Sequence, residues 1–146
     1  MPLLAVHYKI ISRQNSIMDS NVIPSDIERF LLKHIDSIAQ LEALLLLRSD
    51  PQSSWGTEAL AKRLYISEKQ TAEIVSELCT GGFLIVKTNK PRRYQYQPNS
   101  VELSNIIARV AETYSKHLVA VTDLIHSKSK NRVQKFADAF RLRKDE

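Results

Sequence analysis

Two adjacent glycines, Gly81 and Gly82, are the feature of this sequence that most constrains its fold. The chain has only three glycines, and a glycine directly after an amphipathic segment is typical of the left-handed backbone that ends an α-helix. Before the pair, apolar residues recur at helical spacing, whereas after it they form a short run followed by strict alternation. We therefore expect a helix to end at the pair and a β-hairpin to follow it.

The helix before the glycines begins at a capping box. Ser67 and Gln70 have the spacing at which the two side chains satisfy free backbone amides of the first turn. This spacing predicts a helix from Glu68 to about Cys79. Its inner face would hold Val75, Leu78 and either Thr71 or Ala72.

Two helices are predicted at the start of the strongly patterned region. Ser25 with Glu28 forms one capping box, and Ser37 with Gln40 forms another, so a helix is expected to begin at each. The second helix continues through 38–47, a leucine-rich stretch that is apolar nearly all round. Such a pattern is typical of a central, buried helix.

A short helix and a hairpin complete the pattern. Thr57 is placed to cap a helix over 58–64, and a tight turn separates it from the next helix. After the glycines, 83–86 predicts a strand, 88–91 has the composition of a turn, and 93–97 predicts the returning strand. This order of elements is that of a helix-turn-helix followed by a wing.

At these residues the segment Thr57–Gln97 resembles the winged-helix domain of MarR-type bacterial transcriptional regulators. The matching parts are Thr57–Leu64 as the first helix, Ser67–Leu78 as the recognition helix, Gly82-Phe83-Leu84 as its exit and Lys87–Arg93 as the wing. The resemblance implies a mostly α fold with a small β-hairpin wing, in which N- and C-terminal dimerisation helices flank the winged helix-turn-helix. It also implies a dimeric, DNA-binding transcriptional regulator, and an effector pocket for an unknown small molecule.

The resemblance also indicates which side chains would meet double-stranded DNA. The recognition helix of a winged helix enters the major groove, and the wing meets the backbone or the minor groove. Thr71 lies either at the groove or turned inward. The candidate DNA-binding residues are Lys62, Arg63, Ser67, Lys69, Gln70, Thr71, Lys87, Lys90, Arg92 and Arg93.

The distribution of charge gives one argument for DNA binding and one against it. The net charge is +5, and the segment 87–99 alone carries +4. The recognition helix, however, carries Glu68, Glu73 and Glu77 against the single Lys69, and carboxylates are repelled by phosphates. The alternative is therefore a winged-helix adaptor that binds protein and does not bind DNA specifically.

The composition excludes several other classes of protein. Three glycines are too few for a glycine-rich phosphate loop or a dinucleotide fingerprint. A single cysteine excludes an intramolecular disulfide and a thiolate zinc cluster, and Cys79 is either a small core thiol or an oxidation sensor. The four histidines are scattered, so we expect no enzyme, no metal and no cofactor. No apolar run approaches the roughly 20 residues that span a bilayer, which predicts a cytoplasmic protein without a membrane partner.

The last third of the chain predicts a long helix over 99–127 with a heptad-like apolar seam. This seam is expected to pack on the N-terminal helix, on a second copy, or on both, and the resemblance implies a homodimer. The expected dimerisation residues are Leu103, Ile107, Val110, Tyr114, Leu118, Val121, Leu124 and Ile125.

The two ends of the chain complete the expected domain organisation, in which 25–98 holds the winged helix-turn-helix with its preceding helices. Residues 128–146 predict a separate basic amphipathic tail, which is either a solvated helix or a contact to DNA phosphate or an acidic partner. We expect residues 1–24 to form an arm that packs on a partner. The alternative is that translation starts at Met18.

Overall fold

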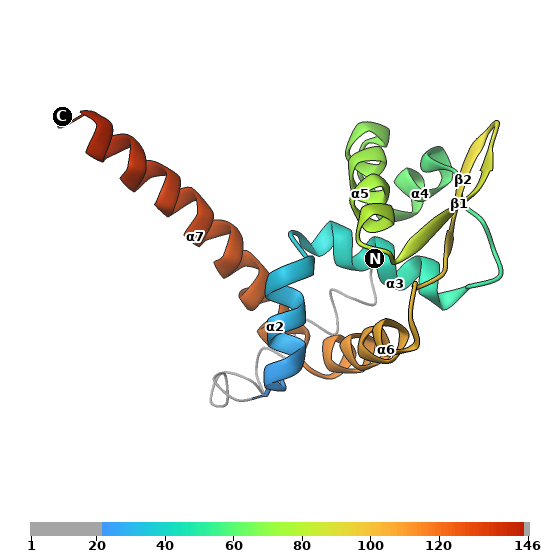
Figure 1. Ribbon diagram of the computed structural model, residues 1–146, viewed down its shortest axis with the longest axis horizontal. Coiled ribbons are helices and arrows are strands. Elements are labelled where there is room, and N and C mark those ends of the chain that lie inside the picture. The colour runs from blue at the N-terminus through green and yellow to red at the C-terminus, as the bar shows by residue number, and fades with distance from the viewer. Residues whose placement is uncertain (1–21, 145–146) are drawn as a thin grey trace. The chain divides into compact units, whose positions relative to one another are not determined.

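The computed structural model describes residues 22–144, with side chains to Arg141. The predicted arm and the alternative start at Met18 lie outside the described residues, apart from 22–24. The described part consists of six helices and one antiparallel pair of strands (Figure 1). Within the described residues the chain divides into two compact units, of which one comprises 38–111 and the other 22–37 with 112–144.

The centre of the first unit, which we call the winged unit, is helix α3 (Ile38–Ser49). It contacts α4 (Thr57–Leu64), α5 (Glu68–Thr80) and strand β2 (Arg92–Tyr96). The residues buried on α3 are Gln40, Leu41, Ala43, Leu44 and Leu47. Each fully buried leucine contributes about 1.5–3 kcal/mol, and the expectation of a central, buried helix is confirmed.

The helix-turn-helix is formed by α4 and α5. Thr57 is the first residue of α4 and not its cap, because Gly56 takes the extended N-cap conformation without a side-chain hydrogen bond. The prediction of a Thr57 cap was therefore wrong. Tyr65 ends α4 in the left-handed conformation, with φ of 58°, and the amide of Ile66 donates to the carbonyl of Ala61, which closes the turn.

Both ends of α5 follow the predicted local chemistry. The Ser67 hydroxyl accepts from the amide of Gln70 at 3.1 Å, which confirms the N-cap. At the other end, the amides of Gly82 and Phe83 donate to the carbonyls of Cys79 and Leu78, each at 3.0 Å. This is the bonding pattern of a Schellman motif, and Gly82 has the φ of +82° that the motif requires.

The wing is the hairpin of β1 (Leu84–Asn89) and β2. Val86 pairs with Tyr94, and the register shifts between Val86 and Thr88. The predicted hairpin is confirmed, although β1 begins one residue later and ends three residues later than expected. On its other edge β2 is bridged by Trp55, because the amides and carbonyls of Trp55 and Tyr94 are joined by two hydrogen bonds of 2.8 Å.

The second unit contains α2 (Ser25–His34), the end of α6 (Val101–Lys116) and α7 (Leu118–Lys144). Pro24 is the N-cap of α2 without a side-chain bond, so the predicted capping box of Ser25 and Glu28 does not form. Proline fixes the backbone at the residue before Ser25, and the helix therefore begins one residue earlier than that box requires.

The predicted single helix over 99–127 and the separate tail were also wrong in their bounds. The helix is interrupted at His117, and α7 then continues without a break through 128–132. The lysine and arginine side chains in this stretch are compatible with a helix. Two of them are held: Lys128 and Arg132 both bind Asp36, which follows the C-cap of α2.

Candidate nucleic-acid interface

The exposed face of α5 carries most of the predicted groove-facing residues. Ser67, Lys69 and Gln70 are exposed in its first turn. The Ser67 hydroxyl accepts from the backbone amide of Gln70, and the residue Gln70 is exposed. Thr71 is fully buried and its hydroxyl donates to the carbonyl of Ser67 at 2.8 Å. The inward alternative therefore holds for Thr71, and we leave it out of the interface.

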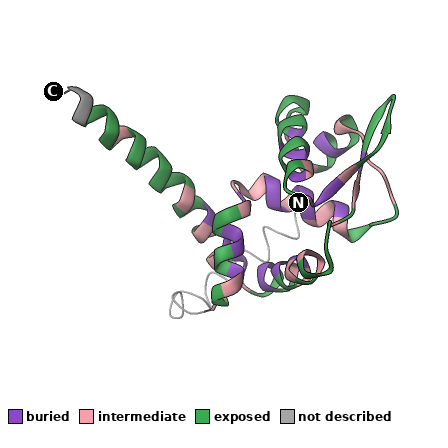
Figure 2. Ribbon diagram, in the orientation of Figure 1, coloured by how far each residue is buried: buried purple, intermediate pink, exposed green. Residues whose placement is uncertain are grey.

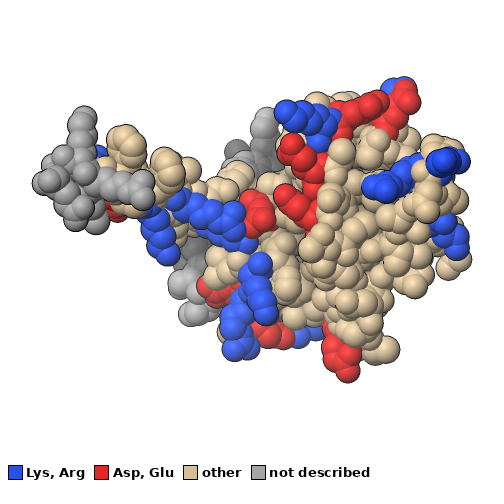
Figure 3. Space-filling model, turned by 45° about the horizontal axis from the view of Figure 1, so that its top comes forward, with Lys and Arg blue, Asp and Glu red and all other residues tan. Residues whose placement is uncertain are grey.

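The same face carries acidic residues, whose charge opposes DNA binding. Glu68, Glu73 and Glu77 are all exposed. Figure 3 shows Asp and Glu side chains interspersed with Lys and Arg on the winged unit. The interface is therefore a mixed surface, and a phosphate backbone would approach it favourably only where the cations lie.

The two predicted cations of α4 differ in their surroundings. Lys62 forms an ion pair with Glu58 at 3.5 Å, with both side chains more than 70% exposed. Exposed pairs of this kind contribute little stability, so Lys62 can exchange Glu58 for a phosphate at small cost. The guanidinium of Arg63 lies over the ring of Trp55, 5.8 Å from its centre, which is within the range of a cation–π contact.

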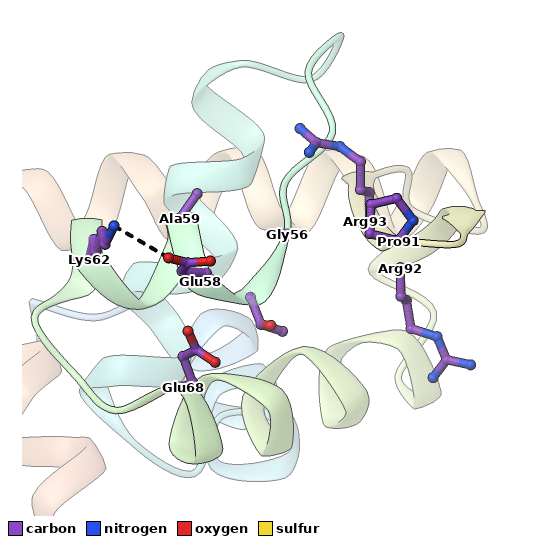
Figure 4. Close-up of a pocket in the computed structure, with 9 residues that line it drawn as sticks. Gly56, Glu58, Ala59, Lys62, Glu68, Pro91, Arg92 and Arg93 are labelled. Carbon is purple, nitrogen blue, oxygen red and sulfur yellow. Dashed lines mark ion pairs between the residues drawn. The ribbon is translucent and has the colours of Figure 1, made fainter.

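The wing presents its cations in two ways. Lys87, Lys90 and Arg92 are exposed. Arg93 is exposed but bound: its Nε donates to the Ser54 hydroxyl at 2.9 Å, and its Nη2 donates to the Ser54 carbonyl at 2.6 Å. Figure 4 shows Arg92 and Arg93 pointing in opposite directions from the hairpin.

An open groove of 560 Å³ lies between the start of α4 and the wing. It brings Lys62 of α4 together with Arg92 and Arg93 of the wing (Figure 4). All three were predicted to meet DNA. The first residues of α4 line its other side, together with Glu58 and Glu68. The groove therefore combines three cations with two carboxylates at the edge of the helix-turn-helix.

One of three comparisons with known proteins found a similar fold. A scan against protein-family models and a search of curated proteins found no match. Among solved structures, the chain is similar to the multiple antibiotic-resistance repressor (MarR) from Listeria monocytogenes 4b F2365, with 18% identity and a TM-score of 0.51. The match covers 99% of this chain and 88% of that chain. The fold is that of a MarR-like winged helix. At this identity the likeness concerns the fold alone.

Within this MarR-like fold, the predicted dimerisation seam is largely covered. Leu103 and Leu124 are half-buried. The other six predicted residues, which are no more than 7% exposed within a single chain, are Ile107, Val110, Tyr114, Leu118, Val121 and Ile125. These six side chains therefore have almost no exposed surface to offer a partner.

A different apolar surface is open on the second half of α7. Val133, Phe136 and Phe140 are 70%, 75% and 63% exposed, and their spacing places them on one side of the helix. We call these three residues the α7 stripe. Figure 2 shows this half of α7 exposed on nearly all sides. The expected dimerisation residues did not include the stripe, because the sequence alone does not show which apolar face of a long helix is already covered.

Cys79, the one cysteine of the chain, is half-buried near the end of α5. Burial raises the pKa of its thiol, and the positive charge of Arg92 only partly opposes this shift. The thiolate is the reactive form of cysteine, so a raised pKa favours the core-thiol interpretation over the oxidation sensor. Within the described residues no group of His, Cys, Asp and Glu side chains is arranged to hold a metal ion, and no helix is long and apolar enough to cross a membrane.

Proposed function

We propose that this protein is a DNA-binding transcriptional regulator. In this proposal α5 enters the major groove, and the wing meets the backbone or the minor groove. The observation that carries the proposal is the exposure of three wing cations, Lys87, Lys90 and Arg92, together with the exposure of the first turn of the capped helix α5. The likeness of the fold to a repressor structure supports it.

The residues of α5 have separate proposed roles. The amide side chain of Gln70 has the donor and acceptor that pair with adenine, and Lys69 can reach guanine or a phosphate. Glu73 is compatible with DNA where its carboxylate accepts from a cytosine amino group. Lys62 and Arg63 on α4 are proposed to contact the sugar-phosphate backbone, which positions α5 without reading sequence.

A salt titration of DNA binding tests this proposal. The affinity of the full chain for labelled duplex from upstream of its own gene is measured by fluorescence anisotropy at about 50–200 mM salt. Binding is expected to weaken steeply with salt, and Lys69→Ala and Lys87→Ala are each expected to lower the salt slope by about one. Lys33→Ala on α2 is the control, since it removes an equal charge from an exposed site outside the winged unit. Absence of binding at low salt would refute the proposal.

We also propose that the regulator is a homodimer formed through the α7 stripe. A helix segment of this length that is exposed on nearly all sides is only marginally stable in water. Pairing of two stripes would bury six large apolar side chains and stabilise both helices. The flanks of the stripe are strongly basic, with seven Lys and Arg and one Asp over 128–144; Figure 3 shows several of these basic side chains along α7.

A winged-helix adaptor remains the second candidate function. The observation that favours it is the acidic character of the exposed α5 face, where Glu68, Glu73 and Glu77 outnumber Lys69. In this case α5 would bind a basic protein surface and the wing would have no role in DNA binding. The same titration separates the two functions, because an adaptor shows no specific affinity for the upstream duplex.

A further inference from the structure

We propose that Arg93 is a positioning residue that holds the wing in place, and that its neighbour Arg92 is the cation that contacts DNA. The part concerning DNA rests on the proposed function. The sequence makes the two arginines equivalent, since both lie in the basic run of the wing. Their surroundings in the fold are different.

The alternation of β2 separates the two side chains. Successive residues of a strand point to opposite faces, so Arg92 shares a face with the buried Tyr94, whereas Arg93 shares the other face with Gln95. Figure 4 shows the two side chains leaving the hairpin in opposite directions.

Arg93 is engaged by the loop that precedes α4. Two of its nitrogens bind the same residue, Ser54, at 2.9 Å and 2.6 Å. On the same face, the side-chain amide of Gln95 donates to the carbonyl of Pro51 at 2.8 Å. The two side chains therefore attach β2 to both ends of the loop 51–54. The bonded residues are 39 positions apart for Arg93 and 44 positions apart for Gln95.

This attachment continues into the backbone. The loop ends in Trp55, which exchanges two hydrogen bonds of 2.8 Å with Tyr94, the residue after Arg93. The ring of Trp55 in turn lies under the guanidinium of Arg63 on α4. Arg93 thus belongs to a connected set of contacts that fixes β2 relative to α4, while Lys90 and Arg92 at the tip of the wing stay exposed.

Lysine distinguishes the two roles. A lysine keeps the positive charge and can replace an arginine at a phosphate, but its single ammonium cannot reproduce the two-pronged contact of a guanidinium. Arg92→Lys is therefore expected to bind DNA nearly as well as the wild type, whereas Arg92→Ala lowers the salt slope by about one. Arg93→Lys and Arg93→Ala are expected to weaken binding alike, by several-fold at every salt concentration, without changing the slope.

Hydrogen exchange in the free protein supplies a readout that does not depend on DNA. In the full chain, Arg93→Ala and Arg93→Lys are expected to speed exchange of the backbone amides of Trp55 and Tyr94 by at least several-fold. Arg92→Ala should leave both amides unchanged. Circular dichroism is recorded for each variant to check that it is folded, so that unfolding is not mistaken for a specific loss of DNA binding.

The outcomes separate this inference from the proposed function. If Arg93→Lys binds like the wild type and Arg93→Ala lowers the salt slope by about one, Arg93 is a phosphate contact and the inference is overturned. Unchanged exchange at Trp55 and Tyr94 in Arg93→Ala also overturns it. If the wild type shows no salt-dependent DNA binding while the exchange result holds, the proposed function fails and the positioning role of Arg93 in the wing stands.

Discussion

The ammonium of Lys128 on α7 lies 2.9 Å from the carboxylate of Asp36, and it also donates to the carbonyl of Ile35 at 2.9 Å. Lys128 is only 11% exposed. Arg132, one turn further along α7, reaches the same carboxylate oxygen at 2.7 Å. Because Ile35 is the C-cap of α2, the two cations also lie where the dipole of that helix favours positive charge. One carboxylate thus holds the middle of α7 against the end of α2.

Removing this carboxylate is expected to destabilise the protein. Asp36→Asn leaves the nearly buried Lys128 without its counter-charge, and we expect the free energy of unfolding to fall by about 1–2 kcal/mol. Asp36 is itself 45% exposed, which keeps the effect below that of a fully buried pair. Urea unfolding followed by circular dichroism measures the change. Asp123→Asn, an exposed position on the same helix, serves as the control and should change stability by less than about 0.5 kcal/mol.

The contribution of Asp36 is expected to depend on pH. Burial alone would raise the pKa of this carboxyl, but hydrogen bonds and charge from Lys128 and Arg132 outweigh burial and lower it. A carboxyl with a lowered pKa stabilises the folded state above its unfolded pKa of about 4, and this contribution is lost as pH falls through the folded pKa. The stability difference between wild type and Asp36→Asn should therefore be constant from pH 7 to 5 and shrink below about pH 4. A difference that is as large at pH 3 as at pH 7 would contradict this account.

His34 adds a second contribution in a different pH range. Burial lowers the pKa of this imidazole, and the charges of Lys33 and Lys128 lower it further. Folding therefore opposes its protonation, so stability is expected to fall as pH drops below about 6.5, the ordinary pKa of histidine. In His34→Gln this loss between pH 7 and 5 should be smaller than in the wild type. Unfolding free energies measured over the pH series check this, and equal slopes for the two proteins would exclude a role for His34.

The proposed dimer is expected to depend on the α7 stripe and to tighten with salt. Replacing Phe136 and Phe140 by Ala removes most of its apolar area and should raise the dissociation constant at least tenfold. Added salt screens the repulsion between the two basic flanks, so the wild-type dimer should become stronger from 50 to 500 mM NaCl, whereas DNA binding becomes weaker. Sedimentation velocity measures the dissociation constant. Asn131→Ala, on the other side of the helix, should leave it unchanged, and a double variant that dimerises like the wild type would disprove the assignment.

The exit of α5 is expected to tolerate no residue other than glycine. In Gly82→Ala the φ of +82° is strained, and the added Cβ would overlap the side-chain amide of Asn99. We expect a loss of about 1–3 kcal/mol in unfolding free energy. Gly56→Ala is the matched control, because a Cβ there meets open space, and it should lose less than about 1 kcal/mol. Thermal and urea unfolding of the two variants give the comparison, and equal losses would refute the argument from strain.

The elements that the sequence predicted correctly depend on local interactions. The Ser67 cap, the Gly82 exit and the alternation of β2 each involve residues a few positions apart, so their chemistry is visible in the order of the side chains. The leucine-rich helix was predicted to be buried because a helix that is apolar nearly all round has no face suited to water. The two mistaken helix starts, at Ser25 and Thr57, differ from the structure by one residue, since the residue before each one takes the cap position.

The tertiary structure decided matters that involve distant residues. The orientation of α5 turns Thr71 inward, and a serine 39 positions away distinguishes Arg93 from Arg92. Asp36 binds Lys128 and Arg132, which lie more than ninety residues later in the chain. Both cations belong to the stretch where the sequence predicted the long helix to end. Apolar spacing shows which side of a helix is to be covered but not by what, so the sequence predicted the seam and left open whether the same chain or a second copy covers it. Local hydrogen bonding therefore determined the elements, and packing between elements decided which of their side chains are left to bind a partner.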